Sequence, residues 1–226
     1  MGLSDIVSKV KNINKPSDVN TPPAFPTDIV QPLEDRKKVD IIIDKQIRMK
    51  YQQGWIKKVR KGNITEVVCH ATAGSTSAHG IMSWVMGGER AALYNKGIGL
   101  FHYLVDRDEP NIVEIIDPTF WVWHSTSGDH DQETIGIEHV NPSMTNRLPL
   151  TENQYELSFN LIFNHLLPQY PTIKRIVSHD YNAWKYSGIG PKPCPGPGFD
   201  WVRLEKEFLK YKLKFNKIGV GAYEIA

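Results

Sequence analysis

A histidine and a cysteine lie on either side of a stiff loop toward the C-terminal end of the sequence. His179 ends the segment KRIVSH, and Cys194 follows within GPKPCPGPG. Zn²⁺ binds imidazole nitrogen and thiolate sulfur readily, and a catalytic zinc site has three protein ligands and one open position. Four prolines in residues 191–197 restrict the loop and would hold Cys194 in place at little ordering cost. We therefore expect a third ligand from the end of a neighbouring strand.

His70 is the best candidate for that third ligand. It ends the segment TEVVCHAT, which reads as a buried strand in which successive side chains point to opposite faces. If His70 faces the metal, Cys69 faces the core. That choice makes Cys194 the ligand and Cys69 a small buried hydrophobe, with both thiols reduced rather than joined in a disulfide.

A structural interpretation of the same residues stays open. A histidine at a strand end is more often a surface or satisfied core residue, and a single cysteine is more often core. A loop rich in Pro and Gly is usually only a loop. The positions of the three candidates do not form a compact metal signature such as Cys-x-x-Cys. Their types and placement alone therefore favour zinc binding and a structural role about equally.

Five stretches of the sequence resemble one known family. In chain order they are VVCHATAG, FHYLVDRD, WVWHSTSG, TIGIEHVN and VSHD…PKPCPGPGFDW, within residues 66–201. With these motifs the chain resembles the zinc-dependent N-acetylmuramoyl-L-alanine amidases of the type-2 group, which share a fold with peptidoglycan recognition proteins and amidase-type phage lysozymes. The resemblance implies that His70, His179 and Cys194 bind one zinc ion, the same three residues that the strand argument selects.

The resemblance also implies two catalytic residues. Lys192 matches a lysine two places before the third ligand, where an ammonium would stabilise the oxyanion formed when water adds to an amide. Without the neighbouring ligand, a solvated loop lysine would be the commoner interpretation. Glu138 matches a glutamate that several members use as general base, and strand alternation places it opposite Ile135 and Ile137. Glu138 would take a proton from the attacking water and pass it to the leaving amine.

One position departs from the family pattern. Some members have a tyrosine just before the histidine of the FHYL stretch, where this chain has Phe101. Tyr103 is displaced by two positions and is expected on the same strand face as Phe101. Since Phe101 has no hydroxyl, we expect a glutamate-assisted rather than a tyrosine-assisted mechanism.

Three further residues are expected to bind substrate. His124, in WVWHSTSG, matches a histidine that lines the substrate groove in relatives, although a structural role is about equally favoured. Trp123, beside Trp121, offers an aromatic face for sugar rings, and core packing is at least as common a role for such a residue. Thr72, in VVCHATAG, is the third expected substrate-binding residue.

Alternating strands and helices are predicted to position these residues. Strands are expected over TEVVCHAT, ETIGIEHV and KRIVSH, a hairpin over LFHYLVDR and NIVEIID, and helices over 79–93, 151–167 and 200–213, the last two capped by Thr151 and Asp200. This order predicts an α/β fold, a single domain with a central mixed β-sheet flanked by helices.

The predicted boundaries divide the chain into three parts. Residues 1–39 are expected to form a short amphipathic helix and a Pro-rich N-terminal arm, which has five prolines in NKPSDVNTPPAFPTDIVQP. Residues 40–213 are the predicted amidase catalytic domain, and residues 214–226 a C-terminal tail. The arm would be available to dock on a partner.

Composition and charge exclude several classes. A net charge of +2 gives no strong field for nucleic acid, and no apolar run approaches the roughly 18 residues that span a bilayer. The N-terminus lacks an apolar core followed by a cleavage site, so we expect cytoplasmic synthesis without a signal peptide.

The resemblance implies hydrolysis of the amide bond between N-acetylmuramic acid and L-alanine, with peptidoglycan or a muropeptide as substrate. A non-catalytic peptidoglycan-binding module is an alternative, and the presence of all three candidate ligands argues against it. A component carried on a virion is another. A bacteriolytic, phage-type lysin released to the cell wall is favoured by analogy.

Overall fold

The structure is a computed structural model that describes residues 59–86, 101–125, 127–143, 148–188, 190 and 193–226. The predicted N-terminal helix and Pro-rich arm (residues 1–39) lie outside these described residues, and so does the predicted start of the domain at residue 40.

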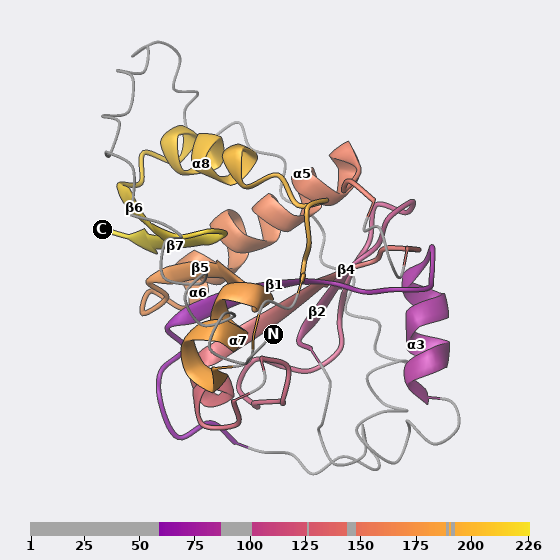
Figure 1. Cartoon of the computed structure of the whole chain (residues 1–226), viewed down its shortest axis with the longest axis horizontal. Helices are drawn as coiled ribbons and strands as arrows, with labels where there is room; N and C mark the ends of the chain where they lie inside the picture. Colours follow the sequence, from indigo (N-terminus) through magenta and orange to yellow (C-terminus); the bar gives the residue numbers. More distant parts are fainter. Residues whose placement is uncertain (1–58, 87–100, 126, 144–147, 189, 191–192) are drawn as a thin grey trace, which may run out of the picture. The chain divides into compact units, whose positions relative to one another are not determined.

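Seven strands in the described part of the chain form one mixed sheet, in the order β3-β2-β4-β1-β5-β7-β6 (Figure 1). The strands are β1 (Glu66–Ala71), β2 (Tyr103–Val105), β3 (Ile112–Glu114), β4 (Thr134–His139), β5 (Arg175–Ser178), β6 (Phe215–Gly219) and β7 (Ala222–Ile225). The four central strands β2, β4, β1 and β5 are parallel. β3 on one side, and β7 with β6 on the other, are antiparallel to their neighbours.

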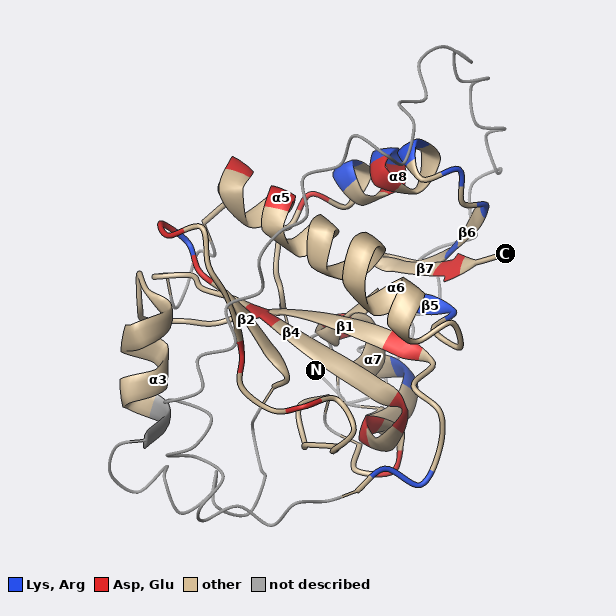
Figure 2. Cartoon of the chain, turned by 180° about the vertical axis from the view of Figure 1, so that it is seen from behind, with Lys and Arg blue, Asp and Glu red and all other residues tan. Residues whose placement is uncertain are grey.

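Helices cover both faces of this sheet. One face, here called the apolar face, packs against α5 (Glu152–Asn160), the π-helical segment η3 (Leu161–Leu166), and α8 (Trp201–Lys210), with the short α6 (Leu167–Gln169) continuing η3. Figure 2 shows α5 and α6 running along this face. The opposite face, here called the histidine face because it carries His70, packs against α3 (Ala78–Met86) and α7 (His179–Ser187). The predicted α/β fold is confirmed.

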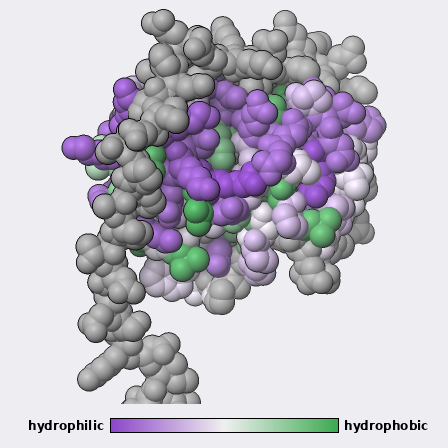
Figure 3. Space-filling view, turned by 90° about the horizontal axis from the view of Figure 1, so that it is seen from above, coloured by the Kyte–Doolittle hydropathy of each residue, from purple (hydrophilic) through white to green (hydrophobic). Residues whose placement is uncertain are grey.

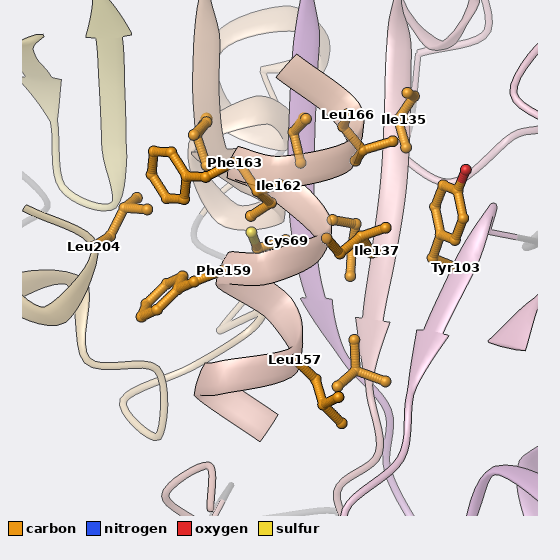
Figure 4. Close-up of a cluster of buried hydrophobic side chains, with 14 of the residues drawn as sticks. Cys69, Tyr103, Ile135, Ile137, Leu157, Phe159, Ile162, Phe163, Leu166 and Leu204 are labelled. Carbon is orange, nitrogen blue, oxygen red and sulfur yellow. The ribbon is translucent and has the colours of Figure 1, made fainter. Parts of the chain in front are cut away.

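The main core lies on the apolar face and follows from strand alternation. Cys69 of β1 and Ile135 and Ile137 of β4 are fully buried there, as alternate residues of neighbouring strands. Figure 4 shows these side chains meeting those of Leu157, Phe159, Ile162, Phe163 and Leu166 from the α5–η3 helical run. The expectation that Cys69 faces the core is confirmed.

The two strongest helix predictions are confirmed at their N-termini. The Thr151 hydroxyl accepts a hydrogen bond from the backbone N–H of Gln154, and the Thr151 backbone N–H donates to the Gln154 side-chain oxygen, which completes a capping box. The helical run continues past Leu167 to Gln169, two residues beyond the predicted end. Asp200 caps α8 by accepting from the backbone N–H of Val202.

Two segments of the chain differ from the prediction. Residues 179–187 form α7 rather than a loop, with Ser178 as N-cap and Gly188 in the left-handed conformation at the C-terminus. Residues 214–226, predicted as a tail, instead contain β6 and β7, which extend the sheet beyond β5. Their short sequence has no clear alternation, and the pairing of β7 with β5 joins residues that are far apart along the chain.

The remaining helix prediction is confirmed only for its first half, since α3 covers Ala78–Met86 and residues 87–93 lie outside the described residues. No helix in the described part of the chain is long and apolar enough to cross a membrane. The described surface seen in Figure 3 is largely hydrophilic, with hydrophobic side chains in small separate groups.

Candidate metal centre

The three predicted ligands are brought together at the carboxyl ends of two neighbouring parallel strands. Cys69 of β1 pairs with Ser178 of β5, so the residues that follow, His70 and His179, are neighbours at the sheet edge. His179 is the first residue of α7. Cys194 comes from the loop after α7, and its backbone carbonyl accepts a hydrogen bond of 2.9 Å from the Asp180 N–H. Strand, helix and loop therefore each place one donor atom.

The donor atoms of His70, His179 and Cys194 all lie within 4.8 Å of one another. The Nδ1 atoms of the two histidines are 3.0 Å apart, and the Cys194 Sγ is 3.9 Å from the His70 Nδ1. All three residues are buried, with exposed fractions of 2%, 6% and 6%.

This donor set fits a zinc ion. Zinc–nitrogen bonds of about 2.0–2.1 Å and a zinc–sulfur bond of about 2.3 Å, arranged tetrahedrally, put the donor atoms about 3.3–3.6 Å from one another. The observed separations of 3.0 and 3.9 Å lie on either side of that range. Two imidazoles and one thiolate are soft enough for Zn²⁺, and three protein ligands leave one position for water or substrate.

The family can now be assigned. The sequence profile described as N-acetylmuramoyl-L-alanine amidase matches residues 60–197, which is more than half of the chain and includes all three donor residues. The chain belongs to the N-acetylmuramoyl-L-alanine amidase family. No curated protein matches the chain closely enough to add to this assignment.

Solved structures agree with this assignment at the level of the fold. The selenomethionine derivative of AmpD is 24% identical in sequence, with a TM-score of 0.52, over 67% of this chain and 89% of that one. Bumblebee PGRP-SA is 13% identical, with a TM-score of 0.50, over 72% of this chain and 93% of that one. At these identities the similarity establishes a shared architecture only.

The two cysteines of this amidase-family chain have different surroundings. Neither forms a disulfide. Cys69 lies among the aliphatic side chains of the apolar face, and its burial, together with the nearby Cys194, raises the pKa of its thiol far above the ordinary value. A thiol in such surroundings is inert, because the thiolate is the form that reacts or binds a metal.

Glu138 lies on the histidine face, on the strand next to the one that carries His70. In the parallel pairing of β1 and β4, Glu138 is the register partner of His70. Its neighbour Ile137 points into the apolar core, so Glu138 points the other way, as the alternation predicts. The Glu138 side chain is half-buried. The Cα positions of Glu138 and His70 are thus adjacent across the two strands.

Tyr103 cannot replace the tyrosine that some family members use. Its side chain is 1% exposed, belongs to the core of the apolar face, and donates a hydrogen bond of 3.3 Å to Glu114. Phe101 packs instead in the cluster beneath α3. The expectation that Tyr103 and Phe101 share a face is therefore wrong, because β2 begins only at Tyr103 and the alternation does not extend back to Phe101.

The residues expected to bind substrate lie in different surroundings. Trp123 is 37% exposed, and its ring centroid is 6.0 Å from that of Trp121. The Thr72 hydroxyl accepts a hydrogen bond of 2.9 Å from the backbone N–H of Asn141, which joins the end of β1 to the segment after β4. The His124 side chain is only 3% exposed and contacts His70. Lys192 lies outside the described residues.

A buried polar network around Arg60 and His102 was not predicted from the sequence. The Arg60 guanidinium lies 2.8 Å from the His102 Nε2 and donates to the backbone carbonyls of Pro118, Asp131, Gln132 and Thr134. Burial lowers the pKa of Arg60 to about 10 and raises that of Asp131 to about 6. Burial, followed by the repulsion of Arg60, also lowers the pKa of His102 well below its ordinary value. The imidazole of His102 is therefore neutral.

Glu66, also missed from the sequence, joins α7 to the sheet. This fully buried carboxylate lies 2.7 Å from the Arg175 Nε, accepts a hydrogen bond of 2.6 Å from the Asn182 side chain, and is 2.9 Å from the His130 Nε2. Asn182 is one turn beyond His179 on α7. The carboxylate thus fixes the helix that begins with one candidate ligand to the strand that carries another. The only sequence signal is an acidic residue that opens an otherwise apolar strand.

Proposed function

We propose that this chain is a zinc-dependent N-acetylmuramoyl-L-alanine amidase that hydrolyses the amide bond between N-acetylmuramic acid and L-alanine in peptidoglycan. The observation that carries the proposal is the convergence of His70, His179 and Cys194 within 4.8 Å, inside the segment that matches the family. Two histidines and a cysteine, all buried and contributed by three separate elements, form a ligand set with one position left for substrate or water.

In the proposed reaction, His70, His179 and Cys194 hold one zinc ion. When bound, such an ion polarises the amide carbonyl and lowers the pKa of water from 15.7 to about 7. Glu138 acts as general base and then as general acid: it takes a proton from the attacking water and delivers it to the amine of L-alanine as the C–N bond breaks. Its place beside His70 on the same sheet face supports this role.

Two further residues complete the proposal. Lys192, two positions before Cys194, would stabilise the negative charge that develops on the carbonyl oxygen. Trp123 would pack against a sugar ring or the stem peptide, and its partly exposed indole beside Trp121 supports this role. The products are the free lactyl carboxylate of N-acetylmuramic acid and the intact stem peptide.

The proposal is tested with a defined muropeptide and the purified full chain. Mass spectrometry of the products is combined with a measurement of the metal content. We expect one bound zinc ion and release of the whole stem peptide. A chelator should abolish the activity and added Zn²⁺ should restore it. A chain that binds the muropeptide without cleaving it, with its zinc present, would instead be a binding module. Cleavage that survives complete removal of zinc would also contradict the proposal.

A further inference from the structure

A series of buried polar contacts begins at the Nε2 atom of His70. The His70 Nε2 lies 3.0 Å from the His124 Nδ1, and the His124 Nε2 lies 2.9 Å from the Thr134 hydroxyl. That hydroxyl is in turn 3.3 Å from the backbone carbonyl of Asp131. His70 ends β1, Thr134 opens β4 and Asp131 lies just before it, whereas His124 comes from the segment between β3 and β4.

The proton positions in this series of hydrogen bonds follow from the ligand role of His70. Its Nδ1 faces His179 and Cys194, so Nδ1 is the metal-binding atom and the neutral ring carries its proton on Nε2. The His124 Nδ1 must then accept a hydrogen bond from the His70 Nε2–H. The neutral His124 ring therefore carries its own proton on Nε2. The His124 Nε2–H donates to Thr134, and the Thr134 hydroxyl donates to the Asp131 carbonyl. Every donor has an acceptor.

The His124 ring is also held by packing. A Cβ atom at Gly136 would lie 2.8 Å from the His124 Nδ1, so the ring occupies space that only a glycine at this strand position leaves open. The ring meets those of His70 and His102 edge to face, at centroid separations of 5.1 and 5.7 Å. With its side chain 3% exposed and both nitrogens in contact with protein atoms, His124 is built into the fold rather than presented to a ligand.

We propose that His124 is a positioning residue for His70, in place of the substrate-binding role expected from the sequence. By accepting the hydrogen bond of the His70 Nε2–H, it fixes the tautomer and ring orientation with which Nδ1 reaches the metal. This inference rests on the proposed zinc centre. Loss of such a partner behind a metal-binding histidine typically weakens metal affinity 10- to 100-fold.

The first test measures Zn²⁺ affinity of the metal-free full chain by competition with a chromogenic chelator. His124→Leu keeps the size of the side chain and removes the acceptor, and should weaken zinc binding about 10- to 100-fold. His124→Asn places an amide oxygen near the position of Nδ1, and should recover most of that loss. Thr134→Val removes the hydroxyl that receives the His124 Nε2–H and should cause a smaller loss. Wild-type affinity in His124→Leu would overturn the proposal.

The second test reads the tautomers directly by long-range ¹H–¹⁵N NMR of the zinc-loaded chain. Both His70 and His124 should carry their proton on Nε2, with the His124 Nδ1 unprotonated. A proton on the His124 Nδ1 would overturn the proposal. Ile162→Val, in the apolar core, is the matched control, because it lowers stability slightly without touching the histidine face. Its zinc affinity should equal that of the wild type.

These measurements separate the two proposals. If the wild-type chain binds no zinc, both fail. If it binds zinc and cleaves the muropeptide, and His124→Leu binds zinc equally well, only the positioning role fails. If zinc affinity depends on His124 but no amide bond is cleaved, the positioning role stands and the proposed reaction fails.

Discussion

The two faces of the central sheet are built from the same strands but hold the protein together differently. On the apolar face, alternate residues such as Cys69 and Ile137 meet the aliphatic and aromatic side chains of η3 and α8. On the histidine face, the intervening residues of β1 and β4 include the polar Glu66, His70 and Glu138, beside two smaller apolar clusters under α3 and α7.

Because of this difference, we expect mutations on the two faces to affect different properties of the protein. Each side chain on the apolar face stabilises the fold by about 25 cal/mol for every Å² of apolar surface that it buries. Such a core tolerates the exchange of one apolar residue for another of similar volume. A buried polar group costs free energy unless its partners are in place, so each one on the histidine face depends on a particular neighbour. We therefore expect mutations on the apolar face to change mainly stability, and those on the histidine face to change metal binding or catalysis.

The two cysteines give the largest predicted contrast. Cys194→Ser should lose zinc on dialysis, and its amidase activity should fall to background, since a neutral hydroxyl does not replace a thiolate ligand. Cys69→Ser should keep zinc and activity and lose about 1–3 kcal/mol of unfolding free energy, because its hydroxyl is buried in the apolar core. Metal analysis, muropeptide cleavage and urea unfolding measure these effects. Zinc loss in Cys69→Ser would break the distinction between the faces.

Glu138 tests whether the histidine face carries the catalytic proton transfer. Glu138→Gln should keep one zinc ion and lower kcat about 10²- to 10⁴-fold, since an amide cannot take up the proton. Glu156, exposed on α5, provides the matched control: Glu156→Gln should change neither zinc content nor kcat. A Glu138→Gln variant with wild-type kcat would show that the general base is another group.

A pair of stability variants compares the faces directly. Leu166→Ala leaves a cavity in the apolar core and should cost about 2–5 kcal/mol of unfolding free energy. Glu66→Ala leaves the Arg175 charge, His130 and Asn182 without their shared carboxylate, and should cost about 3–5 kcal/mol.

Zinc affinity distinguishes this pair. Glu66→Ala should also weaken zinc binding, because α7 carries His179, whereas Leu166→Ala should not. Both are measured on the metal-free chain by urea unfolding and then by chelator competition. Equal zinc affinity in the two variants would show that Glu66 has no part in placing His179.

The smallest predicted effect belongs to a helix cap on the apolar side. Thr151→Ala removes the acceptor for the Gln154 N–H and should cost about 1 kcal/mol of unfolding free energy. Zinc content and kcat should not change. A measurable loss of zinc in this variant would show that the two faces are coupled through α5.

Features of the fold that depend on local sequence signals could be predicted, and those that depend on distant contacts could not. The strands around Cys69, Ile137 and Val177 and the helix after Thr151 could be predicted because their signals, buried apolar runs and a capping box, are local. The sheet residues of β7 could not, since the pairing of β7 with β5 joins distant segments, and β6 joins the sheet only through β7.

The site shows the same limit. Strand alternation separated Cys69 from His70 and placed Glu138 opposite Ile137. The partners of Glu66 lie at positions 130, 175 and 182, and the contact between His124 and His70 spans two elements. Nothing in the local sequence marks such contacts, because they arise only when the chain has folded.

The central claim is that three side chains from separate elements bind one zinc ion, and diffraction at the zinc absorption edge tests it most directly. Crystals of the full chain grown with one equivalent of Zn²⁺ should give a single anomalous peak, about 2.0–2.1 Å from the Nδ1 atoms of His70 and His179 and about 2.3 Å from the Cys194 Sγ. A peak elsewhere in the molecule, or no peak beside these three atoms, would contradict the account.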